Sequence, residues 1–280
     1  MLRRRVRQIR KAVALLRHPV FRRGLRFGVG ASIEHQQHLT GLSLATVVDI
    51  GANVGQFSLL IRALYPDARI FAFEPLARPA NVYQRLFGGD PQVRLYQDGV
   101  APAADAGEMH VSRRDDCSSL LPISTRQVEF APGTEEVGRE RVSLVTLAQR
   151  LSGQEIVSPV LLKLDVQGFE LEALKGCEPL LHLFDFVYAE VSFVELYVGQ
   201  ALADEVIDWL LARDFRISGI TNLSFGRDGR VVQADIMFRN SRVPAQRSYS
   251  VSRADIRTES AAGPLPGTVR PLTTDEIGSD

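Results

Sequence analysis

Three residues at fixed spacing, Asp49, Gly51 and Gly55, stand where a predicted strand turns into a predicted helix. A glycine turn between a buried strand and a helix brings backbone amides close to a ligand at the N-terminus of the helix. Asn53 occupies the position at which a dinucleotide-binding turn has its second glycine. That glycine admits a pyrophosphate, so we expect a cofactor without one, and S-adenosylmethionine is such a cofactor.

Two more acidic residues follow predicted strands at suitable distances. Glu74 ends the predicted strand 69–73, nineteen residues after Gly55. A carboxylate at the tip of the second strand of a strand-helix-strand unit can accept both hydroxyls of a ribose. Asp98 follows the predicted strand 93–96, where it would reach an adenine amino group, although a turn-forming role explains it equally well.

A second pair of carboxylates, Asp165 and Glu190, ends two apolar runs that are typical of central strands. Adjacent strand tips meet at the edge of an open α/β sheet where ligands bind. The pair could act as a general base, orient an acceptor hydroxyl or bind a divalent cation. We favour a metal-free site with Asp165 as base, because only Glu195 and Gln167 are candidates for a third oxygen ligand.

Other residues have a chemical and a structural interpretation. His110 is a further candidate base, although an ordinary strand or loop histidine is the simpler interpretation. Lys163 lies in a buried run and needs a carboxylate partner, which favours a structural ion pair. Glu170 either caps a helix or belongs to the site. Cys117 and Cys177 have no histidine partner nearby in the sequence, so we interpret neither as a nucleophile.

The elements that position these residues alternate between strand and helix. The stripe Phe57, Leu60, Ile61 and Leu64 predicts a helix that Pro66 ends. Predicted strands cover residues 47–50, 69–73, 93–96, 160–165, 186–191, 215–220 and 234–238. The last two are joined by a tight turn at residues 228–229. This order predicts an α/β fold, a doubly wound, mostly parallel seven-stranded sheet with an antiparallel last strand, which we place at the edge.

The middle of the chain shows little periodicity. Residues 101–108 are rich in turn formers, and residues 112–140 are polar and irregular. We expect a long loop here, and a loop of that length inside a compact domain is usually functional or mobile.

Four stretches of the chain resemble the FkbM family of S-adenosylmethionine-dependent methyltransferases. They are Asp49-Ile50-Gly51-Ala52-Asn53-Val54-Gly55, Phe73-Glu74-Pro75, Leu162-Lys163-Leu164-Asp165-Val166-Gln167-Gly168-Phe169-Glu170 and Glu190-Val191-Ser192-Phe193-Val194-Glu195-Leu196-Tyr197. The resemblance covers residues 45–239 and implies a Rossmann-like class I methyltransferase. It implies O-methylation of a hydroxyl on a sugar, polyketide or related metabolite.

The resemblance also implies how the cofactor is held. Asp49, Gly51, Asn53 and Gly55 would surround the methionine part of S-adenosylmethionine, and Glu74 would hold its ribose. The chemistry of the residues agrees, because the Asp49 carboxylate can pair with an α-ammonium and the glycines admit the backbone.

Charge is distributed unevenly along the 280 residues. The first thirty hold ten Lys or Arg and no acid, so that 23 basic residues face 33 acidic ones in the remainder. We predict a basic helical N-terminal extension over 1–45, a methyltransferase domain over 46–240 and a flexible tail over 241–280. The two cysteines, and the lack of a membrane-spanning run or a signal-peptide core, lead us to expect a cytoplasmic protein.

The N-terminal extension has an apolar face formed by Leu2, Val6, Ile9 and Val13. Docking on the acidic body is the favoured role, ahead of peripheral contact with an anionic membrane and then of RNA binding. Residues 1–30 contain no predicted strand, so we expect their deletion to leave cofactor binding intact.

A small-molecule or glycan acceptor is the expected partner, without nucleic acid. An RNA methyltransferase that grips RNA through the extension is the first alternative, opposed by the acidic body and by the lack of a basic-aromatic strip. A non-catalytic adaptor that retains the fold is the second, opposed by Asp49, Glu74, Asp165 and Glu190. A dehydrogenase is the third, opposed by Asn53.

Overall fold

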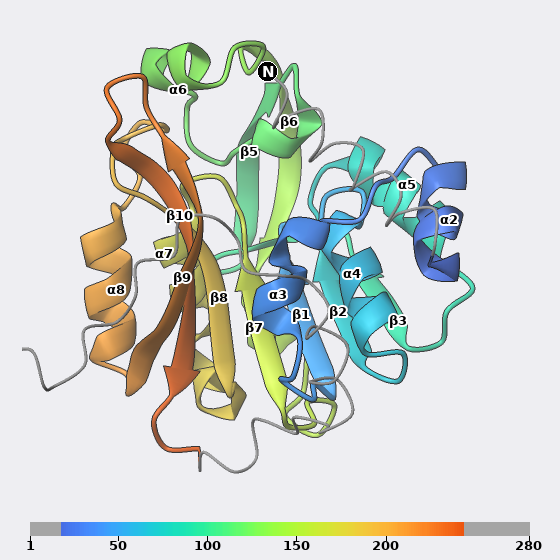
Figure 1. Cartoon of the computed structure of the whole chain (residues 1–280). Coiled ribbons are helices and arrows are strands. Elements are labelled where there is room, and N and C mark those ends of the chain that lie inside the picture. Colours follow the sequence, from blue (N-terminus) through green and yellow to red (C-terminus); the bar gives the residue numbers. More distant parts are fainter. Residues whose placement is uncertain (1–17, 244–280) are drawn as a thin grey trace, which may run out of the picture. The chain divides into compact units, whose positions relative to one another are not determined.

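A computed structural model describes residues 18–243 of the chain (Figure 1). The predicted apolar face at residues 2–13 and the tail from residue 244 onward lie outside the described residues. Within residues 18–243, no helix combines the length and the apolar character needed to cross a membrane.

A seven-stranded sheet forms the centre of the described chain, with the strand order β3-β2-β1-β7-β8-β10-β9. Five of its strands are parallel: β1 Thr46–Ile50, β2 Arg69–Phe73, β3 Val93–Tyr96, β7 Val160–Leu164 and β8 Phe186–Ser192. The apolar runs predicted to be central strands are β7 and β8, and every residue of β7 is buried. These five predicted strands are therefore confirmed.

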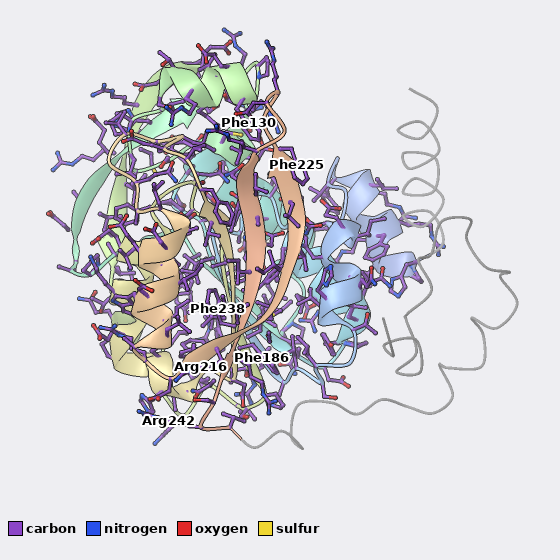
Figure 2. The ribbon with its side chains drawn as sticks, turned by 60° about the vertical axis from the view of Figure 1, so that its left-hand side comes forward. Phe130, Phe186, Arg216, Phe225, Phe238 and Arg242 are labelled. Carbon is purple, nitrogen blue, oxygen red and sulfur yellow. The ribbon has the colours of Figure 1, made fainter. Side chains whose placement is uncertain are left out.

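The last two strands form a long hairpin, β9 Phe215–Phe225 and β10 Val231–Asn240. β10 is antiparallel to both β8 and β9, so the predicted fold class with an antiparallel last strand is confirmed. Its predicted place at the edge is wrong, because β9 pairs with its outer side. In Figure 2 Phe186 and Phe238 lie within the core, whereas Phe225, at the end of β9, is 57% exposed.

Helices cover both faces of the sheet, as a doubly wound fold requires. The described α-helices are α2 Pro19–Arg26, α3 Gln36–Leu39, α4 Gln56–Leu64, α5 Ala77–Phe87, α6 Thr125–Phe130, α7 Glu170–Cys177 and α8 Ala203–Leu211. Short 3-10 helices lie at η1 Ile33–His35, η2 Asp115–Cys117, η3 Leu147–Gln149 and η4 Glu178–Leu183.

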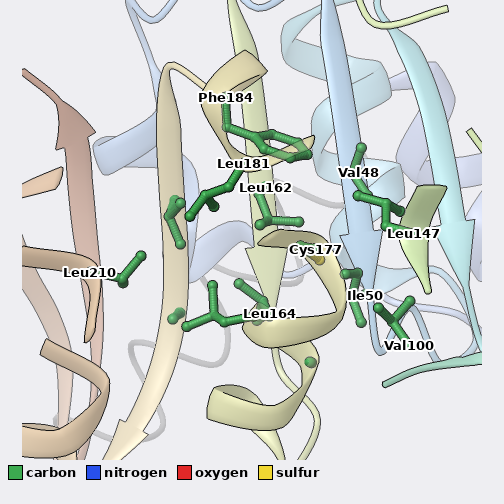
Figure 3. Packing of buried hydrophobic residues seen from close by; sticks show 14 of the residues in the cluster. Val48, Ile50, Val100, Leu147, Leu162, Leu164, Cys177, Leu181, Phe184 and Leu210 are labelled. Atoms are coloured by element: carbon green, nitrogen blue, oxygen red, sulfur yellow. The ribbon is translucent and has the colours of Figure 1, made fainter. Parts of the chain in front are cut away.

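Alternation along the strands separates two apolar layers. Val48 and Ile50 of β1 face α7, α8 and η4, together with Leu162 and Leu164 of β7 (Figure 3). Val47 of β1 points to the opposite face, which α2, α3, α4 and α5 cover. Successive side chains of a strand point to opposite faces, so this pattern follows from the sequence.

The described part of the N-terminal extension packs into the second layer. Phe21, Val29 and Leu39 are buried there, and a Cβ on Gly24 would lie 2.4 Å from a methyl of Leu59 on α4. The backbone N–H of Ser32 donates to the first carbonyl of α4 at 3.2 Å. We expected deletion of residues 1–30 to leave cofactor binding intact. The structure argues against this expectation, because residues 18–30 contribute to the core.

The middle of the chain is ordered, which our sequence analysis missed. The strands β4 Gly99–Val100, β5 Asp105–Ser112 and β6 Glu136–Val145 form a second sheet in the order β4-β6-β5. The predicted loop over 112–140 is therefore wrong, since it contains α6 and the start of β6. Most residues of β5 and β6 are exposed or half-buried, so these strands lack the apolar alternation that identifies a half-buried strand.

Candidate active site

The carboxyl ends of the parallel strands border a cavity of about 540 Å³. The main sheet, the N-terminal segment and the second sheet all contribute to its wall. Polar lining residues include Glu34, His35, Asn53, Glu74, Asp98, Arg114, Gln127, Lys163, Asp165, Gln167, Glu190 and Gln233. Ligands of open α/β folds bind at this edge of the sheet, so the cavity is the candidate active site.

The turn after β1 needs glycine for two reasons. Gly51 has φ +78°, and a Cβ there would lie 1.9 Å from the carbonyl oxygen of Asp165. The turns after β1 and β7 are thus in direct backbone contact. Asn53 also adopts a left-handed conformation, with φ +47°, and its side-chain Oδ1 accepts from Val54 N–H at 2.6 Å. Asparagine tolerates this region better than most residues, which explains its presence.

Gly55 caps α4 and does not line the cavity. It has φ +97°, and a Cβ there would lie 2.7 Å from the ring of Phe87. The tight packing of α4 on α5 explains this glycine. The structure therefore gives Gly55 a role in helix packing, while Gly51 and Asn53 lie at the cavity wall.

Glu74 occupies the position predicted for a ribose acceptor. Its carboxylate lines the cavity, is 6% exposed, and accepts from Asn53 N–H at 3.0 Å and Leu76 N–H at 2.8 Å. Burial raises the pKa of Glu74 to about 7, although these two hydrogen bonds oppose the shift. An ionised carboxylate has about four acceptor positions, so two remain for further donors.

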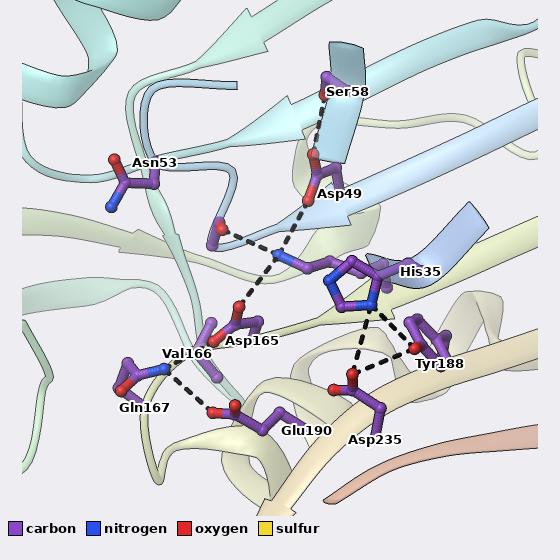
Figure 4. Close-up of polar contacts among 12 residues, drawn as sticks. His35, Asp49, Asn53, Ser58, Asp165, Val166, Gln167, Tyr188, Glu190 and Asp235 are labelled. Atoms are coloured by element: carbon purple, nitrogen blue, oxygen red, sulfur yellow. Dashed lines mark hydrogen bonds and ion pairs between the residues drawn. The ribbon is translucent and has the colours of Figure 1, made fainter. Parts of the chain in front are cut away.

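Asp49 lies behind the cavity wall. Its side chain is fully buried and accepts from the Ser58 hydroxyl at 2.8 Å. The Lys163 ammonium lies 3.2 Å from the other carboxylate oxygen and donates to the Gly51 carbonyl at 3.0 Å (Figure 4). The predicted ion pair of Lys163 is confirmed. Lys163 lines the cavity and Asp49 does not, so the lysine stands between this carboxylate and a ligand.

Asp98 lines the cavity but already has a partner. Arg150 donates to both of its oxygens, at 2.7 and 3.0 Å. Burial acts to raise the pKa of Asp98, but the hydrogen bonds from Arg150 and Ser143 outweigh it and lower the pKa. Asp98 is therefore an ionised, fixed part of the wall.

Asp165 and Glu190 meet at the cavity through a shared amide. The Gln167 Nε2 group donates to Asp165 at 2.7 Å and to Glu190 at 3.1 Å (Figure 4). Gln233 also donates to Glu190 at 3.2 Å. Burial and the nearby Asp165 carboxylate raise the pKa of Glu190 well above its ordinary value. The structure thus brings together the two carboxylates that the sequence paired.

Gln167 is positioned by its own turn. It has φ +54°, its Oε1 accepts from the Tyr197 hydroxyl at 2.7 Å, and its carbonyl accepts from Ser119. Glu170 closes the same turn, accepting from the backbone N–H groups of Val166 and Gly168 at 3.0 and 3.2 Å. Burial raises the pKa of Glu170 to about 7. Glu170 therefore supports the site without lining it.

Two predicted candidates lie elsewhere. His110 is buried on β5, where its Nδ1 lies 2.8 Å from Glu136, and it does not line the cavity. The exposed Glu195 closes a surface turn by accepting from Gly199 N–H. Within residues 18–243, no group of three or more His, Cys, Asp or Glu side chains is arranged to hold a metal ion. Burial raises the pKa of the Cys117 thiol to about 12, which makes this residue a poor nucleophile.

Sequence reasoning missed several residues of the cavity wall, and His35 and Gln127 are two of them. His35 comes from η1, within the segment that we assigned to the extension, and Gln127 comes from α6, within the predicted loop. The Gln127 Oε1 atom is buried without a hydrogen-bond partner in the described structure. No local motif marks either residue, because each reaches the cavity through tertiary packing.

Comparisons with known proteins identify the family of the chain. The family described as the methyltransferase FkbM domain matches residues 49–217. The 2-O-methyltransferase NoeI of Sinorhizobium fredii is 25% identical over 231 residues, which cover 80% of this chain and 91% of that protein. Methyltransferase sdnD of Sordaria araneosa is 29% identical over 160 residues, 47% of this chain and 60% of that protein.

A third relative is much longer than this chain. The AMB antimetabolite synthetase AmbE of Pseudomonas aeruginosa is 43% identical over 211 residues, which are 62% of this chain and 10% of that protein. Among solved structures, a putative rRNA methylase from Clostridium thermocellum aligns with 75% of this chain and 96% of its own, at a TM-score of 0.43 and 11% identity.

Proposed function

Since this chain belongs to the FkbM methyltransferase family, we propose that it transfers the methyl group of S-adenosylmethionine to a hydroxyl oxygen of a sugar, polyketide or related metabolite. That it is an S-adenosylmethionine-dependent methyltransferase follows from the family and its relatives. The oxygen acceptor is the proposal, and the name of the relative NoeI, a 2-O-methyltransferase, supports it.

The observation that carries the proposal is the carboxylate pair at the cavity. Asp165 and Glu190 have oxygens directed to one small region, fixed there by the Gln167 amide. Carboxylates accept hydrogen bonds from hydroxyls, and two of them hold a hydroxyl in a defined direction. Such positioning supplies much of the acceleration of a displacement that requires the acceptor in line with the breaking bond.

The cavity fits the cofactor on chemical grounds. Glu74 offers unused acceptor positions beside the turn at Gly51 and Asn53, which suits the two hydroxyls of a ribose. In our proposal the backbone of that turn borders the methionine part, and Lys163 lies near its charged end. Bound S-adenosylmethionine supplies an electrophilic methyl group on a positively charged sulfur. The protein residues bind it, orient the acceptor and keep both in one cavity.

Calorimetry with S-adenosylhomocysteine and NAD, side by side, tests the cofactor. We expect binding of S-adenosylhomocysteine and none of NAD. Reaction with methyl-¹³C S-adenosylmethionine and a panel of glycans, macrolides, amines and total RNA then tests the acceptor. The chemical shift of the transferred carbon distinguishes O-methyl from N-methyl products. Label that appears only on nitrogen or only in RNA would contradict the proposal.

A further inference from the structure

A buried polar cluster surrounds His35, at the part of the cavity wall that the N-terminal segment provides. The Nδ1 atom of His35 lies 2.9 Å from the Tyr188 hydroxyl and 3.3 Å from a carboxylate oxygen of Asp235 (Figure 4). The side chains of His35 and Asp235 are 19% and 11% exposed. The cluster is therefore largely removed from water, although His35 itself lines the cavity.

The hydrogen bonds of the cluster favour one tautomer of His35. The Tyr188 hydroxyl donates to Asp235 Oδ2 at 3.1 Å, and Asn222 Nδ2 donates to the same oxygen at 2.7 Å. With its proton given to Asp235, the Tyr188 oxygen is free to accept from His35. Asn222 Nδ2 also lies 3.1 Å from Nδ1, but it is closer to Asp235 Oδ2, to which it donates at 2.7 Å. The two oxygens near Nδ1 are acceptors, which favours the tautomer with the proton on Nδ1 and the lone pair on Nε2.

Aromatic contacts fix the plane of the ring. The imidazole meets Phe57 and Tyr188 edge to face, at centroid distances of 5.7 and 5.6 Å. A ring held by two aromatic neighbours and by hydrogen bonds at Nδ1 has a single orientation. In that orientation Nε2 lies on the side of the ring away from Asp235.

The register of the sheet places this cluster beside the carboxylate pair. Asp235 of β10 lies directly opposite Glu190 of β8, and Tyr188 precedes Glu190 by two residues on the same strand. Directly opposed residues, and residues two apart on one strand, share a face of the sheet. His35 therefore lies on the face that carries Glu190, one step back from the strand tips.

We propose that His35 is the general base of methyl transfer, with Asp235 and Tyr188 as its positioning residues. This assignment rests on the proposed hydroxyl acceptor. The acceptor oxygen forms its bond to the methyl carbon while the carbon–sulfur bond breaks and its electron pair stays on sulfur. The hydroxyl proton moves to Nε2 of His35, and the imidazolium later returns it to water.

The contacts of His35 suit the role of general base better than those of Asp165 do. The Asp165 carboxylate already accepts from the Gln167 amide at 2.7 Å and lies 3.8 Å from the Lys163 ammonium, so it has partners of its own. The imidazolium of His35 would instead form 3.3 Å from the carboxylate of Asp235, which stabilises the charge. Asp165 and Glu190 are left to orient the acceptor.

Nitrogen NMR of the ¹⁵N-histidine-labelled full chain tests the assignment without an acceptor. His35→Gln identifies the signal of His35 among the five histidines. We expect the tautomer protonated at Nδ1 in the wild type, and its loss in Asp235→Asn. A His35 signal protonated at Nε2 in the wild type would overturn the proposal, since that nitrogen could not accept a proton.

Turnover with methyl-¹³C S-adenosylmethionine and the same acceptor panel gives the second measurement. General-base removal typically costs about 10²- to 10⁴-fold, so His35→Gln should lower kcat by such a factor. Affinity for S-adenosylhomocysteine and the melting temperature should stay close to wild type. His38→Gln is the matched control, because His38 lies three residues away and does not line the cavity.

The two proposals fail in different ways. O-methylation by the wild type with equal kcat in His35→Gln would overturn the base assignment alone. Transfer only to nitrogen or RNA would overturn the proposed function and, with it, the role of His35. A purely structural role for His35 predicts a lower melting temperature with an unchanged kcat.

Discussion

At the scale of single residues, the carboxylates in and behind the cavity wall have two different roles. Glu74 lines the cavity at the tip of β2 and keeps acceptor positions free, whereas Asp49 lies behind the wall beside Lys163 and both oxygens of Asp98 accept from Arg150. The same type of side chain is thus a ligand contact in one place and a structural anion in the others. A position on the cavity wall together with unused acceptor positions marks the carboxylate that a ligand can still use.

Replacing Glu74 with Ala should weaken S-adenosylhomocysteine binding by about 10- to 150-fold. A hydrogen bond to a charged group contributes about 1.5–3 kcal/mol, which gives this factor. The variant should keep a cooperative thermal melt, because the Glu74 side chain bonds only to backbone groups of the turn. Unchanged affinity in the folded variant would remove Glu74 from the cofactor site.

The raised pKa of Glu74 predicts that binding depends on pH. The carboxyl is neutral below a pKa of about 7 and ionised above it, and the ionised form is the better acceptor for hydroxyls. Affinity for S-adenosylhomocysteine should therefore rise as the pH increases through 7. Glu74→Gln should show a flatter profile in the same calorimetric series, and an equally steep one would assign the dependence to another group.

Asp165→Asn should separate acceptor chemistry from cofactor binding. Asparagine preserves the shape but loses the charge that accepts from Gln167, so kcat/KM for a hydroxyl acceptor should fall by about 10- to 150-fold. S-adenosylhomocysteine affinity should stay within about twofold of wild type, which is under about 0.5 kcal/mol. Steady-state kinetics and calorimetry on the same preparation check both, and full activity would exclude Asp165 from the mechanism.

At the scale of elements, the turns after β1 and β7 depend on each other. A side chain on Gly51 would collide with the carbonyl of Asp165 at 1.9 Å, so the cofactor turn and the acceptor turn share one contact. The sequence predicted both turns because each follows a strongly apolar strand. It could not predict their contact, since residues 51 and 165 are brought together only by the pairing of β1 with β7.

Gly51→Ala should destabilise the fold beyond the strain of its backbone conformation. Alanine in a left-handed conformation costs about 1–2 kcal/mol. Gly229→Ala is the matched control, because Gly229 has φ +79° against +78° for Gly51 and a Cβ there meets nothing within 4 Å. Urea unfolding should show a further loss of about 1–3 kcal/mol in Gly51→Ala. Equal losses of unfolding free energy in the two variants would show that the turn after β7 moves away from the new methyl group without cost.

Site residues could be predicted from the sequence where their signal is local, and were missed where only tertiary packing brings them to the cavity. Glu74, Asp165 and Glu190 were identified because strand tips are recognisable locally and parallel strands end at one edge. Lys163 revealed its ion pair because a buried ammonium requires one. His35 and Gln127 carried no such signal, and the exposed faces of β5 and β6 hid the second sheet.

At the scale of the whole molecule, the N-terminal segment belongs to the active site. Residues 18–39 cover α4 and supply Gly30 and His35 to the cavity wall. The basic composition of residues 1–17 suits attachment to an anionic membrane, a role separate from the active site.

Two deletions separate these roles. Removing residues 1–30 takes away Phe21 and Val29, whose burial contributes about 1.5–3 kcal/mol each, so the melting temperature and S-adenosylhomocysteine affinity should both fall. Removing residues 1–17 leaves every contact among residues 18–243 in place and should preserve both. Membrane attachment by residues 1–17 is tested by sedimenting the full chain and the 1–17 deletion with vesicles that contain phosphatidylserine. Wild-type stability after the longer deletion would show that residues 18–30 add nothing to the core.

The pairing of His35 with Asp235 has a consequence for the order in which the protein is completed. The two residues are 200 positions apart, so their contact closes almost the whole described chain. During synthesis the cofactor turn, Glu74 and Asp98 leave the ribosome long before β10 does. A chain stopped before Val231 would hold those residues yet leave His35 without Asp235. Nascent chains should therefore acquire the elements of cofactor recognition early and the geometry for proton removal last.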